Sequence, residues 1–144
     1  MRVVGHIDIS RPATEVFAYV SDQTNGPEWQ QGLDEVQRVT DGPIGVGSRH
    51  RFLRRLGGRQ VTGENEYIEF EPGRRVVFTF TSDGVNGKGW YDANPLGVDR
   101  TRLEYGVEIQ LLGLTRLASP LIEMSIRKED RKDTARLKEI LERT

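Results

Sequence analysis

The sequence has no cysteine and only two histidines, His6 and His50, among its 144 residues. Without cysteine, disulfide bonds and thiolate chemistry are excluded. No acidic residue is spaced from a histidine as in a His-Glu-x-x-His zinc motif, and no glycine-rich stretch carries the Lys-Ser or Lys-Thr of a phosphate-binding loop. A nucleophile elbow with its serine is also missing. We therefore expect no metal site and no cofactor.

An excess of positive charge is missing too. The chain has 21 lysines and arginines against 22 aspartates and glutamates, so its formal net charge is −1. Its isoelectric point is about 6.2. Because nucleic-acid-binding domains usually have an isoelectric point above about 9, we expect no nucleic-acid partner.

Long hydrophobic runs are also absent. A membrane-spanning helix needs about 18 or more consecutive apolar residues, and no segment comes near that length. We expect no signal peptide in the first ten residues, since Gly5, His6 and Asp8 interrupt their apolar residues. We therefore expect a cytoplasmic protein with no stable membrane insertion, present as a monomer or a homodimer.

What the sequence does contain is a regular succession of short elements. Its 144 residues fall within the ~100–200 typical of one domain, and no repeat or linker divides them, so we expect a single domain over 1–144. Alternating and helical periodicities predict one strand, two short helices, six strands and a long helix, which is an α+β order. The predicted strands are 3–9, 34–40, 48–56, 59–70, 75–82, 88–94 and 101–111, and the helices are 12–22, 27–33 and 115–143.

Residues 49–59, RHRFLRRLGGR, place five arginines around a glycine pair. Gly57-Gly58 predicts a two-residue hairpin turn, because both central residues of such a turn need a positive φ. This turn places arginines opposite glutamates on a solvated outer face, and residues of the other parity on an inner face. The expected pairs are Arg49–Glu66 and Arg51–Glu64 outside, with His50–Asn65 and Phe52–Gly63 inside.

A second glycine turn predicts the next hairpin. Asn86-Gly87 is a strong two-residue turn dipeptide, and it pairs Phe80 with Ala93. Each predicted strand then has one apolar, aromatic-rich face and one charged face, and only the C-terminal helix is long enough to cover the apolar side. The residues expected on that side include Phe78, Phe80, Tyr91, Ala93, Leu103, Tyr105, Val107 and Ile109.

The long helix carries an acid in the middle of its apolar stripe. Helical spacing puts Ile122, Ile126, Leu137, Ile140 and Leu141 on one side. Asp130 falls among them, with Asp133 and Thr134 beside it. Acids are costly at a fully packed interface. Either the helix bends so that they reach water, or a cavity separates helix from sheet and holds water or the polar end of a ligand.

Several segments together carry a resemblance to a known family. They are SRPATEVFAYVSD (10–22), Pro27-Glu28-Trp29, GVGSRHRF (45–52), EYIEFEPGRRVVFTF (66–80) and ARLKEILER (135–143). In order and spacing the chain resembles the polyketide cyclase/dehydrase branch of the START/SRPBCC superfamily. The resemblance implies a helix-grip fold, in which a seven-stranded antiparallel sheet wraps around a long C-terminal helix, with two short helices after strand 1. It also implies a hydrophobic ligand cavity between helix and sheet.

The candidate site combines this resemblance with the inner-face residues. Members of the family are similar in binding lipids, sterols, quinones, polyketides or plant hormones, and some are cyclases or aromatases. We expect a small hydrophobic ligand as the partner, with a plain packed core as the alternative for the same positions. The expected ligand-binding residues are Trp29, Phe52, Asn65, Tyr67, Phe78, Phe80, Tyr91, Tyr105, Ile126 and Asp130.

Two other functions stay open. In the first, the protein is a polyketide cyclase or dehydratase in which His50 acts as general base while Asn65 or Tyr67 orients a carbonyl. In the second, it is a regulatory interaction module that uses Arg54, Arg55 and Arg59, which we expect at the solvated tip of the first hairpin. Simple binding is favoured over both, so we do not expect an enzyme.

Overall fold

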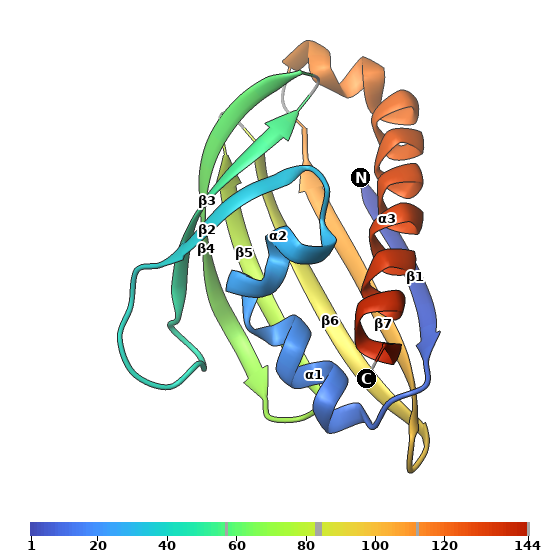
Figure 1. Cartoon of the computed structure of the whole chain (residues 1–144). Helices are drawn as coiled ribbons and strands as arrows, with labels where there is room; N and C mark the ends of the chain where they lie inside the picture. The colour runs from blue at the N-terminus through green and yellow to red at the C-terminus, as the bar shows by residue number, and fades with distance from the viewer. Residues whose placement is uncertain (57, 83–84, 112, 144) are drawn as a thin grey trace.

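The computed structural model describes residues 1–56, 58–82, 85–111 and 113–143. In this part of the chain an antiparallel sheet of seven strands curves around a long C-terminal helix, and two short helices follow the first strand (Figure 1). The expected α+β helix-grip fold is therefore confirmed. The strands are β1 (Arg2–Ile9), β2 (Leu33–Arg38), β3 (Arg49–Leu56), β4 (Arg59–Glu71), β5 (Arg75–Ser82), β6 (Val85–Gly97) and β7 (Arg100–Gln110). The α-helices are α1 (Ala13–Ser21), α2 (Gly26–Trp29) and α3 (Ser119–Glu142), and the 3-10 turns are η1 (Gln23–Asn25) and η2 (Gly113–Ala118).

The strand order in the sheet is β1-β7-β6-β5-β4-β3-β2. Each strand from β2 to β7 pairs with its neighbour in the chain, as hairpins do, whereas β1 pairs with β7. The chain therefore passes from one edge of the sheet to the other between β1 and β2. The short helices α1, η1 and α2 make up this connection (Figure 1).

The β3–β4 hairpin has the predicted register. Arg51 lies opposite Glu64, and both are exposed, with 3.5 Å between Nη2 and Oε1. His50, which has the opposite parity, is completely buried. The predicted turn includes Gly57, which lies outside the described residues. Gly58 has a φ of 79°, as a two-residue hairpin turn requires.

The predicted register of the β5–β6 hairpin is wrong. Phe80 lies opposite Gly87, not opposite Ala93, so Asn86-Gly87 belongs to strand β6 and does not form the turn. The two strands are joined through residues 83–84, which lie outside the described residues. The two registers differ by an even number of residues, so every side chain keeps its predicted face.

Two helix boundaries also differ from the prediction. Helix α2 ends at Trp29 rather than at residue 33, because Leu33 is already the first residue of β2. Residues Gly113–Ala118 form the 3-10 turn η2, so α3 begins at Ser119 rather than at 115. Pro120 lies in the first turn of α3, where its missing N–H costs no hydrogen bond within the helix.

Four glycines on the concave face of the sheet stand directly opposite aromatic residues. A methyl group at any of these glycines would collide with the opposite ring. Each ring therefore lies close over its glycine, whereas a larger residue there would push the ring toward α3. This arrangement leaves room between the sheet and the helix. The pairs are Gly5–Tyr105, Gly63–Phe52, Gly87–Phe80 and Gly89–Phe78.

The last turns of α3 belong to the main hydrophobic core. Leu137 is completely buried and shares a cluster with Ile9 of β1, Leu103 of β7 and Val16 of α1. Core packing of this kind holds a helix to a sheet through the apolar area that it removes from water. Among the described residues, no helix has both the length and the apolar composition needed to cross a membrane.

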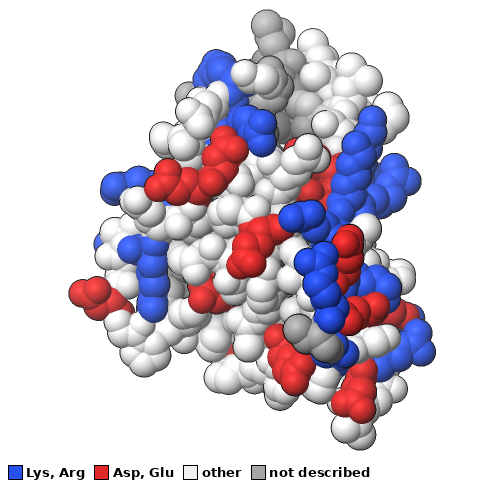
Figure 2. Space-filling view, viewed as in Figure 1, with Lys and Arg blue, Asp and Glu red and all other residues white. Residues whose placement is uncertain are grey.

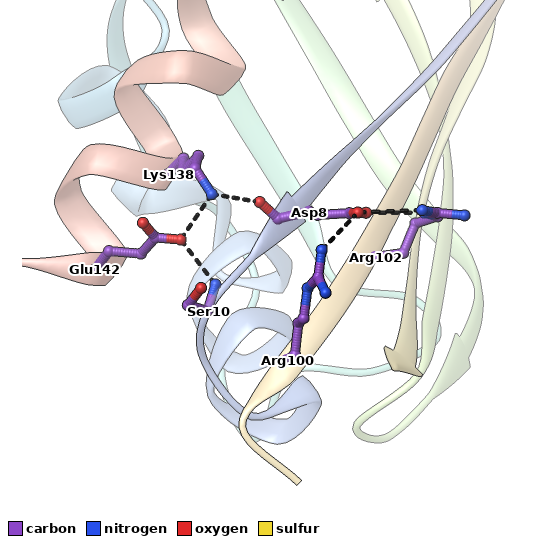
Figure 3. Close-up of polar contacts among 6 residues, drawn as sticks. All are labelled: Asp8, Ser10, Arg100, Arg102, Lys138 and Glu142. Atoms are coloured by element: carbon purple, nitrogen blue, oxygen red, sulfur yellow. Dashed lines mark hydrogen bonds and ion pairs between the residues drawn. The ribbon is translucent and has the colours of Figure 1, made fainter. Parts of the chain in front are cut away.

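Polar contacts attach the same end of α3 to β1 (Figure 3). Lys138 Nζ donates to the carbonyl oxygen of Asp8 at 2.7 Å and to Glu142 Oε2 at 2.8 Å. The backbone N–H of Ser10 donates to the same carboxylate at 2.7 Å. The hydrogen bond from Lys138 is the main reason that the pKa of Glu142 is lowered. We call residues 137–142 the anchor segment of α3.

Candidate functional site

A cavity of about 270 Å³ lies between the concave face of the sheet, the end of α2 and the middle turns of α3. Its size is close to the lower end of common ligand pockets, roughly 300–1,000 Å³. Residues 126–134 of α3 cover it, and we call them the cavity segment. The residues predicted from the sequence that line it are Trp29, Phe52, Asn65, Phe78, Phe80, Tyr91, Tyr105, Ile126 and Asp130.

Aromatic rings make up much of the wall. Four of them are the inner-face rings that lie over glycines, Phe52, Phe78, Phe80 and Tyr105. Trp29, at the end of α2, meets Tyr91 of β6 edge to face, with ring centroids 6.1 Å apart. These rings make most of the wall on the sheet side apolar, which favours the burial of an apolar body.

His50 and Tyr67, also predicted as site residues, are not among the residues that line the cavity. Both are completely buried, with ring centroids 5.3 Å apart. His50 Nδ1 lies 3.0 Å from Asn65 Oδ1, and Asn65, which does line the cavity, also donates to Gln23. Asn65 therefore stands between His50 and the cavity. Burial lowers the pKa of His50, so the neutral imidazole is favoured.

Arg54 lies at the wall of the cavity instead of at a solvated hairpin tip. It is half-buried, and its Nη2 donates to Gln30 Oε1 at 2.9 Å. Arg55 contacts the same loop: its Nη2 donates to the carbonyl oxygen of Gln31 at 2.9 Å, and its Nε lies 3.1 Å from Asp34 Oδ1. The expectation of a solvated side chain was wrong for Arg54, because the loop after α2 packs against β3, whereas Arg55 is exposed as expected.

Three carboxylates of α3 line the same end of the cavity: Glu129, Asp130 and Asp133. Burial, reinforced by the charges of Asp133 and Glu129, raises the pKa of Asp130 to about 6. The positive charges of Arg54 and Arg127 oppose this shift. A carboxyl group with such a pKa exchanges its proton near neutral pH.

Asp133 is the most buried of the three carboxylates. Its Oδ1 accepts a hydrogen bond from the backbone N–H of Gln31 at 3.2 Å, which ties the loop after α2 to α3. Burial nevertheless raises the pKa of Asp133. Burial also raises the pKa of Tyr91 and of Tyr105, and the charge of Asp130 contributes in both cases. These hydroxyl groups therefore stay protonated at neutral pH.

The sequence prediction missed Gln30, Arg54, Glu129 and Asp133 as wall residues, although it noted Asp133 beside Asp130 in the helix. Arg54 had a usable signal, because it has the same parity in its strand as His50 and Phe52. Gln30 had none, since no periodicity places a residue of an irregular loop. In the described part of the chain, no three His, Asp or Glu side chains gather in a way that could hold a metal ion.

Comparison with known proteins agrees with this architecture. A family model described as polyketide cyclase / dehydrase and lipid transport matches residues 1–142. An uncharacterized protein of Mycobacterium tuberculosis, Rv2574, is 25% identical over 132 residues, which cover 85% of this chain and 75% of that protein.

Two solved structures have a similar fold. The Zhui aromatase/cyclase of Streptomyces sp. R1128 superimposes with a TM-score of 0.82 at 17% identity, over 99% of this chain and 94% of that one. A START superfamily protein of Mycobacterium smegmatis has a TM-score of 0.80 at 15% identity, over 99% and 97% of the two chains. At these identities the similarity shows a shared fold. With a family match over nearly its whole length, the chain belongs to the polyketide cyclase/dehydrase and lipid transport family of START-like, helix-grip proteins.

Proposed function

We propose that this protein binds a small hydrophobic molecule in the cavity between the sheet and α3. The observation that carries the proposal is the composition of the wall: the sheet side is mostly apolar and aromatic, and carboxylates of α3 lie across from it together with Arg54 and Gln30. Ligand pockets typically have this division, in which apolar surface supplies affinity and a few polar groups fix orientation.

The size of the cavity narrows the ligand class. Its volume of about 270 Å³ lies just below the common range of ligand pockets, roughly 300–1,000 Å³. A two-ring aromatic compound or a short lipid chain suits this space better than a whole sterol. Among lipids, polyketides, quinones and sterol-like molecules, the smaller polyketides and quinones are therefore the favoured classes.

The charges at the polar end narrow the class further. Three carboxylates, Glu129, Asp130 and Asp133, face one guanidinium, that of Arg54, which already donates to Gln30. A carboxylate on the ligand would be repelled there, whereas a hydroxyl group or a protonated amine would find acceptors. Such a ligand would anchor on Asp130, and its apolar body would lie against Phe78 and Phe80.

A matched series of naphthalene probes tests this proposal. Fluorescence titration with 2-naphthylmethylamine, 2-naphthalenemethanol and 2-naphthoate compares a cation, a neutral hydroxyl and an anion on one apolar body. We expect saturable binding of the amine and the alcohol, and binding at least 10-fold weaker for the carboxylate. Native mass spectrometry of the purified protein would identify any ligand that is retained.

A cavity-filling variant provides the control for location. Ile126→Trp places an indole in the cavity and should weaken the alcohol probe at least 10-fold, while Val98→Trp, at a surface position that is 88% exposed, should leave its affinity unchanged. If the Ile126→Trp protein keeps a native circular dichroism spectrum and full affinity, the probe does not bind in this cavity and the proposal fails.

A second candidate function is acid–base catalysis of ring closure on a carbonyl compound in the same cavity. The observation in its favour is a carboxyl group on the cavity wall, that of Asp130, with a pKa of about 6. Asp130 is a better placed general base than His50, which lies behind Asn65. Incubation with a poly-β-ketone mimic separates the two functions: turnover that is lost in Asp130→Asn and kept in His50→Gln supports catalysis. Saturable binding without turnover supports the carrier.

A further inference from the structure

The end of η2 and the outward face of the first half of α3 carry a stripe of three exposed apolar residues followed by three cations. Leu117, at the end of η2, is 81% exposed, and Leu121 and Met124 are 69% and 60% exposed. Helical spacing of three and four residues continues the same face to Lys128, Arg131 and Lys132, which are also exposed. We call these six residues the apolar–basic stripe.

The acids of this part of α3 lie elsewhere. Glu129 and Asp130 are on the cavity wall, and Glu123 pairs with Arg127 along the helix at 2.9 Å. Glu129 and Asp130 thus face the cavity, while the three cations of the stripe face solvent. Figure 2 shows Lys and Arg side chains gathered over the upper part of α3, on the face in view.

We propose that the apolar–basic stripe docks this protein onto the surface of an anionic lipid bilayer. Exposed leucine and methionine side chains next to several cations are the composition of helices that lie in the membrane interface. The apolar side chains enter the boundary between headgroups and acyl chains, while the cations meet lipid phosphates. This is peripheral docking, and it requires no membrane-spanning segment.

The size of the stripe argues against a protein partner as the occupant. A stable protein–protein interface involves about 20–30 residues on each side, and three apolar side chains provide only a small part of such a surface. A bilayer needs no complementary shape, since its headgroups adapt to what is inserted. The clustering of three cations also favours a partner with a uniformly negative surface.

Docking through this stripe would place the cavity beside the membrane. Ile126 and Asp130, on the cavity wall, belong to the same helical turns as Met124 and Lys128, on the outward face. Membranes are where hydrophobic molecules of the proposed ligand class dissolve. The docking itself does not depend on what the cavity holds, so the two proposals can fail separately.

Vesicle binding at about 0.1 M salt tests the proposal. We expect the full chain to co-sediment with phosphatidylcholine vesicles that contain 30% phosphatidylglycerol and not with vesicles of phosphatidylcholine alone. The triple variant Lys128→Gln/Arg131→Gln/Lys132→Gln should weaken binding about 100-fold, at roughly 5-fold for each cation near the surface. The control triple Arg49→Gln/Arg51→Gln/Arg74→Gln makes the same change in net charge at three other exposed arginines and should retain binding.

A fluorescent label tests the apolar part of the stripe. Because the chain has no cysteine, Met124→Cys gives a single attachment site for a nitrobenzoxadiazole label. Anionic vesicles should shift its emission to shorter wavelength, whereas the same label at Val98→Cys, far more exposed than most apolar positions, should show no shift. Leu121→Ser/Met124→Ser should lose most vesicle binding while its thermal unfolding temperature stays unchanged.

Three results would overturn the proposal. The first is equal binding to vesicles with and without phosphatidylglycerol. The second is unchanged vesicle binding in both stripe variants. The third is a dimer in light scattering that Leu121→Ser/Met124→Ser converts to a monomer, which would make the stripe a contact between two copies. In each case the naphthalene titrations still test separately whether the cavity binds a ligand.

Discussion

The anchor segment and the cavity segment belong to one helix and face one sheet, yet they meet it differently. In the anchor segment, Leu137 is completely buried in the main core and Lys138 hydrogen-bonds to the backbone of β1. In the cavity segment, Ile126 and Asp130 face an open volume of about 270 Å³. The first arrangement removes apolar area from water on all sides, and the second leaves part of it without protein neighbours.

This difference separates stability from function along the helix. Well-packed segments contribute most to the free energy of unfolding, whereas ligand-binding elements belong to the less stable parts of a protein. The four glycine–aromatic pairs explain why the sheet leaves space under the cavity segment. All four of their rings line the cavity: Phe52, Phe78, Phe80 and Tyr105.

The largest expected effect compares one truncation in each segment. Leu137→Ala should lower the free energy of unfolding by about 2–5 kcal/mol, because it removes methyl groups from a filled core. Ile126→Ala should cost about 1 kcal/mol, since its side chain is only half-buried and borders a cavity. Urea unfolding at neutral pH measures both. Equal losses would mean that the space under Ile126 is filled and that the two segments do not differ in packing.

A smaller effect is expected from the polar attachment of the anchor segment. Lys138→Met keeps the apolar stem and removes both hydrogen bonds, to the Asp8 carbonyl and to Glu142. We expect a loss of about 1 kcal/mol, below the ~1.5–3 kcal/mol of fully buried charged hydrogen bonds because Lys138 is partly exposed. Lys132→Met, an exposed position on the same helix, is the matched control and should cost nothing measurable. Similar losses in the two variants would show that the hydrogen bonds of Lys138 do not help to attach α3 to the sheet.

The smallest effect concerns the pH dependence that Asp130 gives to stability. Its pKa is about 6 when folded against 3.8 for the unperturbed group, so the folded state binds this proton more tightly than the unfolded state does. Stability from this group is therefore lost as pH rises from about 4 to about 6, and the loss is complete above that range. Asp130→Asn should stabilise the protein at pH 7.5 by roughly 1 kcal/mol, a value reduced from the full pKa difference because the carboxyl is partly exposed.

The same variant should show little gain at pH 4, where the wild-type carboxyl is protonated in the folded state and only about half ionised in the unfolded state, so that most of the pH-dependent loss has not yet occurred. Unfolding free energies of the two proteins at both pH values give this difference directly. Asp133, whose pKa is also raised, loses the neighbouring charge of Asp130 in the variant, which adds to the difference in the same direction at high pH. A pH-independent difference would show that Asp130 is as well solvated as a surface carboxylate.

Residue parity within the strands could be predicted well, because it depends only on local alternation and turn type. The β3–β4 register followed from Gly57-Gly58 and is confirmed from Arg49–Glu66 through Phe52–Gly63. The β5–β6 register was wrong because the sequence has two turn-forming dipeptides close together, Asp-Gly at 83–84 and Asn-Gly at 86–87. In the observed register Phe80 lies over Gly87 and Phe78 over Gly89. Turn propensity alone cannot predict this packing between residues of two strands.

By itself, the sequence determined which side chains face the helix and that acids interrupt the apolar stripe of that helix. Both are periodic properties of single elements. Together they predict that the helix is not fully packed against the sheet at Asp130. Only the tertiary structure decided which inner-face residues reach the cavity. Parity assigns a side chain to a face but not to a position under the helix. The curvature of the sheet and the loop after α2 therefore put Arg54 and Gln30 on the wall and His50 and Tyr67 behind it.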